Sequence, residues 1–233
     1  MKKAVLAALA VLLCLSAGAA AFFAAGRIQR AWIYGKLKEK APFAGSAAFE
    51  ELRAVNPDIF AWISIPGTDV DYPVVKHPDD DAYYLTHTVE GAAGSPASIF
   101  ACGYTAEDFS QFNTVLYGHD PVFGGMFSEL NRFYDPAYRE EHKTVRIGTP
   151  EGDFTYTVVA CVDYDDRLID TCFDQRDPAD RRAFVASVRA CLPDGAESAG
   201  LEAIDVLSDH LLTLETCRGA ADRRTVVLAV RND

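Results

Sequence analysis

One cysteine and one arginine near the end of the sequence have a spacing that suits nucleophilic chemistry. Residues 211–230 read LLTLETCRGAADRRTVVLAV, two apolar runs joined by a short polar loop. If the runs pair as a hairpin across the loop Arg218–Arg223, Cys217 and Arg224 lie opposite each other, with Cβ atoms about 5 Å apart. An arginine so close lowers the pKa of a thiol and favours the nucleophilic thiolate. It could equally donate two hydrogen bonds to an oxyanion or a substrate carbonyl.

The same pattern also has a purely structural interpretation. Cys217 could be a packed residue that ends a strand, with arginines that only solvate the turn. Arg223 is the poorer partner for the thiol, because neighbouring residues of a strand point to opposite faces.

The number of cysteines points to at least one unpaired thiol. Cys14 lies in an apolar N-terminal stretch, and five cysteines follow it: Cys102, Cys161, Cys172, Cys191 and Cys217. Exported proteins tend to pair their cysteines, so an odd number leaves one over. The sequence has no C-x-x-C motif, and therefore neither a zinc ribbon nor a disulfide scaffold is indicated. Whether the other four form bridges stays open.

A catalytic thiol also needs a histidine as acid and base, and the chain has five. His119 follows the strand-like run NTVLYG directly and stands in GHDPVFGG, where glycines let the backbone turn sharply and hold an imidazole at a strand tip. The alternative is that His119 is an ordinary polar loop residue. A metal site at His210 and Cys217 lacks a third ligand at suitable spacing, so no metal or other cofactor is expected.

The N-terminus predicts export. Residues 4–26 carry no charge, and this stretch is long enough to cross a bilayer as a helix. We expect residues 1–26 to be an uncleaved signal anchor, although small residues around Ala19–Ala21 leave a cleaved signal peptide open. The prediction is a single-pass protein of the cell membrane, with a helical juxtamembrane linker at 27–46 and an extracellular domain at 47–233.

Charge is distributed unevenly along the 233 residues. From Ala41 onward the chain carries 15 basic and 33 acidic side chains, a net charge near −18. Such a surface repels nucleic acid, so DNA and RNA partners are not expected.

The elements that must position these residues are mostly short strands. Apolar runs bounded by Gly, Pro, Asp and Asn predict strands at 61–65, 70–75, 98–100 and 113–118, a hairpin across 143–164, and the two terminal strands. Residues 47–55 predict a helix that stops before Pro57. A further helix is predicted at Pro178–Leu192, with Asp177 as its N-cap. The pattern favours a mostly-β barrel with helical decoration.

Several stretches together resemble the sortases, the cysteine transpeptidases of Gram-positive cell surfaces, and in particular their class B. TLETC at Thr213–Cys217 resembles the TLxTC signature, and RTVVLAV resembles the closing strand that begins with the family's arginine. The stretches at 56–75, 81–87, 113–120 and 124–147 are also similar to class B segments in the same order. The resemblance implies a closed β-barrel of about eight strands, with N-terminal helices and a helix between strands six and seven.

The resemblance also implies roles for four residues. Cys217 would be the nucleophile that attacks a sorting signal after its threonine and forms a thioacyl enzyme. His119 would protonate the leaving amine and later deprotonate the incoming one. Arg224 would bind the substrate and steady the oxyanion, and Thr216 would line the substrate groove.

The implied partners are the sorting-signal peptide of secreted proteins and an amine of a peptidoglycan precursor or a pilin. The chain departs from the family pattern in a short loop after Cys217, in the absence of a carboxylate close behind it, and in Cys102 where relatives commonly have an aspartate. These departures affect substrate preference more than chemistry.

Two other functions stay open. One is a hydrolytic cysteine peptidase or cell-wall amidase, although papain-like enzymes place the cysteine before the histidine in the chain, the reverse of His119 and Cys217. The other is a non-catalytic module that binds sorting signals.

Overall fold

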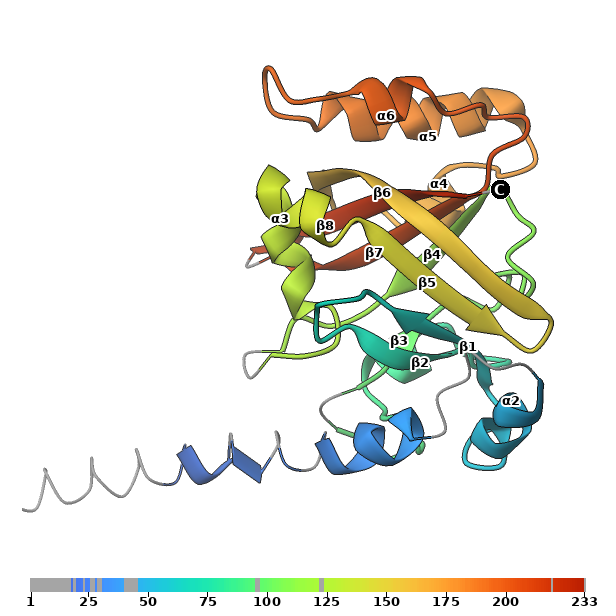
Figure 1. Cartoon of the computed structure of the whole chain (residues 1–233), viewed down its shortest axis with the longest axis vertical. Coiled ribbons are helices and arrows are strands. Elements are labelled where there is room, and N and C mark those ends of the chain that lie inside the picture. The colour runs from blue at the N-terminus through green and yellow to red at the C-terminus, as the bar shows by residue number, and fades with distance from the viewer. Residues whose placement is uncertain are drawn as a thin grey trace, which may run out of the picture.

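The strands of this protein close into a barrel (Figure 1). The computed structural model describes residues 18, 20–22, 24, 25, 28, 31–39, 46–94, 97–121, 124–218 and 220–232, with only the backbone at 46, 47, 217, 218, 220 and 221. The strands are β1 (Ile59–Ser64), β2 (Asp71–Val75), β3 (Ile99–Phe100), β4 (Asn113–Tyr117), β5 (Thr144–Thr149), β6 (Gly152–Asp165), β7 (Leu211–Arg218) and β8 (Ala220–Arg231). Their order around the barrel is β1-β2-β3-β4-β7-β8-β6-β5.

The pairing is mixed. β2 with β3 and β4 with β7 run parallel, and the other six pairs are antiparallel. β4 is buried along its whole length, including its polar residues Asn113 and Thr114, so its side chains do not alternate between buried and exposed. The prediction of a mostly-β, closed barrel of about eight strands is confirmed.

The helices surround the barrel. They are α2 (Ser46–Arg53), η1 (Tyr83–Leu85), η2 (Ser128–Tyr134), α3 (Pro136–Glu141), α4 (Ile169–Cys172), α5 (Pro178–Ala190) and α6 (Ala199–Glu202). α5 begins as the sequence indicates, because the Asp177 side chain accepts a hydrogen bond from the Ala179 N–H at 2.8 Å. Phe184 and Val188 bury its apolar stripe, and Figure 1 shows α5 and α6 along one outer side of the barrel.

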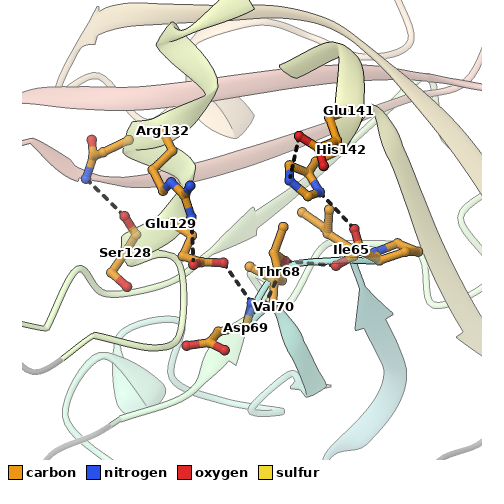
Figure 2. Close-up of polar contacts among 11 residues, drawn as sticks. Ile65, Thr68, Asp69, Val70, Ser128, Glu129, Arg132, Glu141 and His142 are labelled. Carbon is orange, nitrogen blue, oxygen red and sulfur yellow. Dashed lines mark hydrogen bonds and ion pairs between the residues drawn. The ribbon is translucent and has the colours of Figure 1, made fainter. Parts of the chain in front are cut away.

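A set of polar contacts ties the β1–β2 turn to η2 and α3, and we call it the turn brace (Figure 2). Its acceptor on η2 is Glu129, whose carboxylate accepts the Asp69 N–H at 2.7 Å and lies 3.4 Å from the Arg132 guanidinium. At the end of α3, His142 Nδ1 lies 3.1 Å from the Pro66 carbonyl oxygen. The brace therefore fixes η2 and α3 against the first hairpin of the barrel.

The register of the last hairpin matches the prediction at its key pair. Cys217 of β7 pairs with Arg224 of β8, as the sequence analysis expected. The predicted loop Arg218–Arg223 is wrong, however, because strand pairing continues to Arg218 opposite Ala220 across an irregularity in the register. Arg223 is itself in β8, where it pairs with Asp165 of β6.

The expectation of a single-pass membrane protein is wrong for the part of the chain that the structure describes. Within it, no helix is both long enough and apolar enough to cross a bilayer. A span needs about 20 apolar residues, whereas the helical residues 31–38 include Lys36 and Lys38 and bury Tyr34 against Tyr72 of the barrel at 5.1 Å between ring centroids. Most of the predicted anchor at 1–26 lies outside the described residues.

Candidate active site

A cavity of about 300 Å³ opens where β4 and β7 end and β8 begins. The described residues that line it are Asp81, Ala82, Leu85, Phe100, Cys102, Tyr104, Tyr117, Gly118, His119, Asp166, Leu168, Thr171, Glu215, Thr216 and Arg224. Three of the four residues predicted for the site, His119, Thr216 and Arg224, are therefore brought together, although His119 lies more than ninety positions before the other two in the sequence.

His119 is held by its neighbours on both sides. Gly118 continues the pairing of β4 with β7, because its N–H donates to the Glu215 carbonyl at 3.0 Å. A Cβ at Gly118 would lie 2.6 Å from the Phe127 ring, so only glycine fits between that ring and the strand. The Phe127 N–H then donates to the His119 carbonyl at 3.1 Å, which fixes the backbone of the histidine.

The imidazole of His119 is oriented by the backbone of η1. Its Nε2 lies 2.5 Å from the Leu85 carbonyl oxygen, which can only accept. Nε2 therefore carries a proton, and Nδ1 is the nitrogen left to exchange one with a substrate.

One residue of η2 links the two halves of the site. The Asn131 side-chain amide donates to the Asp120 carboxylate at 2.9 Å, and its oxygen accepts from the Thr225 hydroxyl at 2.5 Å. Asp120 follows His119 and Thr225 follows Arg224, so Asn131 bridges the loop of the histidine and the strand of the arginine.

The two arginines of β8 diverge as predicted. Arg224 lines the cavity, and its Nε lies 3.5 Å from Glu215 Oε1. Arg223 instead donates to Asp163 of β6, to both its carboxylate and its carbonyl oxygen, each at 2.8 Å. Since neighbouring residues of a strand face opposite ways, only Arg224 belongs to the cavity.

Cys217 is placed by its backbone, opposite Arg224 in the strand register. Thr216, the residue before it, is buried and lines the cavity with a hydroxyl that has no hydrogen-bond partner among the described residues. A buried hydroxyl left unpaired is unfavourable, which makes it a ready contact for a bound molecule.

Glu215 is a site residue that the sequence analysis missed. It is only 5% exposed, and burial raises the pKa of its carboxyl to about 8, although Arg224 opposes that rise. The signal was present in TLETC, where a charged residue interrupts an apolar strand that the sequence analysis treated only as a family signature.

A second missed group lies on the other wall of the cavity. Tyr117 donates to the Asp170 carboxylate at 2.9 Å, and burial raises the pKa of that carboxyl to about 6. Cys102, whose position departs from the family pattern, lines the same wall, and burial raises the pKa of its thiol to about 12. This thiol is therefore neutral near pH 7 and is a poor nucleophile.

The remaining candidates lie elsewhere. None of the other four histidines lies among the described cavity-lining residues, and each has a ring nitrogen bonded to a backbone group: His77, His87, His142 and His210. Among the described side chains, Cys102, Cys172 and Cys191 are not bridged, and the buried Cys161 thiol donates to the Leu130 carbonyl at 4.0 Å. In the described ranges, no three His, Cys, Asp or Glu side chains gather closely enough to hold a metal ion.

The described geometry agrees with what comparison with known proteins finds. The family model for the Sortase domain matches residues 63–232. The chain belongs to the sortase family. Membership confirms the expectation of a cysteine transpeptidase of the sortase type.

Individual relatives point to class B, as the sequence analysis expected. The chain is 33% identical to sortase B of Listeria monocytogenes over 94 residues, which is 40% of this chain and 38% of that relative. It is 27% identical to sortase B of Staphylococcus aureus over 187 residues, 78% of this chain and 73% of that relative. A solved Staphylococcus aureus sortase B has a TM-score of 0.73 at 24% identity, covering 89% of this chain and 98% of that one.

Proposed function

We propose that residues 47–233 form a catalytic domain that cleaves a C-terminal sorting signal of secreted proteins after a threonine. The acyl group is then transferred to an amine of a peptidoglycan precursor or of a pilin. The observation that carries this proposal is the cavity in which His119, Thr216 and Arg224 meet beside the backbone of Cys217.

The first half-reaction is acylation. The Cys217 thiolate attacks the carbonyl carbon of the threonine, and the Arg224 guanidinium stabilises the negative charge that develops on the carbonyl oxygen. The peptide bond then breaks to leave a thioester on Cys217. His119 gives a proton to the leaving amine, and its bond to the Leu85 carbonyl places that mobile proton on Nδ1.

The second half-reaction is transfer. The incoming amine loses its proton to His119 and attacks the thioester, the carbon–sulfur bond breaks, and the thiolate of Cys217 is restored. Apolar side chains such as Leu85, Phe100 and Leu168 line the cavity, and a bound peptide that covers them would limit access of water, which favours an amine over hydrolysis.

Peptide binding in this cavity is supported by a relative. The Staphylococcus aureus structure of the same fold is described as a sortase B–substrate complex. We infer that the present chain holds its sorting signal over Thr216, whose unpaired hydroxyl can bond a peptide backbone group.

The test uses the purified full-length chain and fluorescence-quenched peptides with NPQTN-, LPXTG- and SPKTG-like signals. The wild type should cleave one of them after threonine, and added amine should divert the product to a transfer product of the corresponding mass. Cys217→Ala should abolish both products, because no other thiol lies beside Arg224 in the strand register.

The other outcomes are equally informative. Cleavage that added amine never diverts would replace the transferase by a hydrolytic peptidase. Binding of a peptide by both the wild type and Cys217→Ala, with cleavage by neither, would make the protein a binding module and overturn the proposal.

A further inference from the structure

Glu215 is a carboxyl group inside an apolar strand, two positions before Cys217. It is 5% exposed, its Oε1 lies 3.5 Å from Arg224 Nε, and its Oε2 is buried with no partner among the described residues. An unpaired buried carboxyl oxygen destabilises the fold by a few kcal/mol. Packing therefore does not account for this side chain, and its position in the cavity wall suggests a role in the chemistry.

We propose that Glu215 is a positioning residue that controls the effective charge of Arg224. When Glu215 is protonated, the guanidinium acts on the site with its full positive charge. When Glu215 is ionised, its negative charge offsets that of Arg224 and weakens the support of the thiolate and the oxyanion. This inference rests on the proposed roles of Cys217 and Arg224.

The strand register explains how one arginine serves both residues. Cys217 pairs directly with Arg224, while Glu215 pairs with Val226, two positions further along β8. Arg224 is therefore the direct neighbour of Cys217 and the diagonal neighbour of Glu215, and long side chains reach across such a diagonal. Nη1 of Arg224 donates to the Arg223 carbonyl at 3.1 Å, which leaves the Nε edge toward Glu215.

Other charges around Glu215 act mainly against its ionisation. Burial is the largest cause of its pKa near 8, and only Arg224 lowers the value. The titratable groups that face it or share its cavity come from the end of β4, the segments before η1 and after β3, the end of β6 and α4: Tyr117, His119, Asp81, Cys102, Tyr104, Asp165, Asp166 and Asp170. Burial together with Asp165, Asp166 and Asp170 keeps Glu215 mostly neutral at pH 7, so that it titrates at mildly alkaline pH.

The test compares wild type with Glu215→Gln, which keeps the shape and removes the titration. The first readout needs no substrate: the rate at which iodoacetamide alkylates Cys217 in the full-length chain, followed by mass of the Cys217 peptide from pH 6 to 10. The variant and the wild type should react alike near pH 6.5. On the rising part of the profile above about pH 8, where Glu215 is ionised and the thiol is still mostly protonated, the variant should be up to about 10-fold faster, the effect of a one-unit pKa shift caused by a nearby like charge. The two rates should converge at the alkaline end of the range, where both thiols are ionised.

The control is Asp163→Asn, which removes a carboxylate from another arginine–carboxylate pair of β8, Arg223 with Asp163 of β6. Its rates should follow those of the wild type at every pH. If Glu215→Gln does not fold, as judged by circular dichroism, Glu215→Met replaces it, because an apolar side chain of similar length removes the unpaired oxygen as well.

A second readout is kcat/KM for the cleaved peptide over the same pH range. It should give the same ratio between variant and wild type, rising only above about pH 8. Alkylation profiles that superimpose for wild type and variant, or a variant that is slower at all pH values, would overturn the inference. If the alkylation profiles differ as expected but no peptide is cleaved, the inference about Glu215 is upheld. That result would count only against the proposed function.

Discussion

The cavity and the turn brace are both polar regions of this barrel, but their polar groups differ in burial and in hydrogen-bond pairing. In the brace, Glu129, Asp69 and His142 lie near the surface and each has a partner (Figure 2). In the cavity, Glu215 and Thr216 are almost fully buried, and each has one oxygen with no partner among the described residues. A partly exposed bond contributes little and an unpaired buried oxygen destabilises.

The polar groups of the brace stabilise the fold, whereas the polar groups of the cavity serve the proposed function. The brace adds a small amount of stability and holds η2, whose Asn131 reaches the neighbours of His119 and Arg224. The cavity residues lower stability in the unliganded protein, and they are arranged around one guanidinium. A change at Arg224 should therefore alter activity far more than stability, a change at Glu215 should make stability depend differently on pH, and changes in the brace should alter stability more than activity.

The largest expected effect is on activity at Arg224. Arg224→Ala should lower kcat/KM by about 100-fold or more, as the loss of one oxyanion donor does, with little change in melting temperature. Peptide cleavage and thermal melts of the same preparation measure both quantities. Arg223→Ala is the matched control, since its partner is Asp163 outside the cavity, and should retain most of the activity. A larger loss at Arg223 than at Arg224 would mean that the proposed roles are reversed.

The next effect is on stability as a function of pH. Because burial raises the pKa of Glu215 to about 8 in the folded protein, the folded chain holds a proton that the unfolded chain has lost above about pH 4.3. The stability contributed by this proton is complete at low pH and is lost as pH rises through about 8.

The wild type should therefore lose on the order of a few kcal/mol of unfolding free energy between about pH 5 and 8 relative to Glu215→Gln. Urea unfolding at several pH values measures the difference. Asp170, whose pKa is raised to about 6, acts in the same direction in both proteins and cancels in the comparison. If the difference in unfolding free energy between the two proteins does not vary with pH, Glu215 is ionised in the folded protein over the whole range.

The smallest effect is expected in the brace. Gly67 has φ +83°, and a Cβ there would lie 2.7 Å from the His142 ring. Gly67→Ala should lower the unfolding free energy by about 1–3 kcal/mol through backbone strain and this contact, while kcat/KM stays within about two-fold at 25 °C. Denaturant unfolding and peptide cleavage check the two statements. A loss of activity larger than the loss of stability would mean that the brace acts on the site.

Much of the fold follows from local patterns in the sequence. The strands, the β5–β6 hairpin and the Asp177 cap of α5 are set by apolar periodicity, turn residues and capping chemistry, which act within a few positions of the chain. The pairing of Cys217 with Arg224 followed from the same local reasoning, because two adjacent strands joined by a short turn have few registers.

What the sequence by itself determined is thus most of the strands, the helices α2 and α5, the pairing of Cys217 with Arg224 and the candidate residues Cys217, His119 and Arg224. Only the tertiary structure decided that Glu215 shares a cavity with Arg224, that Asp170 meets Tyr117, and that Asn131 joins the two halves of the site. The physical reason is that burial and charge pairing depend on which distant segments pack together. The pairing of β4 with β7 and the packing of α4 and η2 beside the cavity set those contacts, and no local pattern encodes that arrangement.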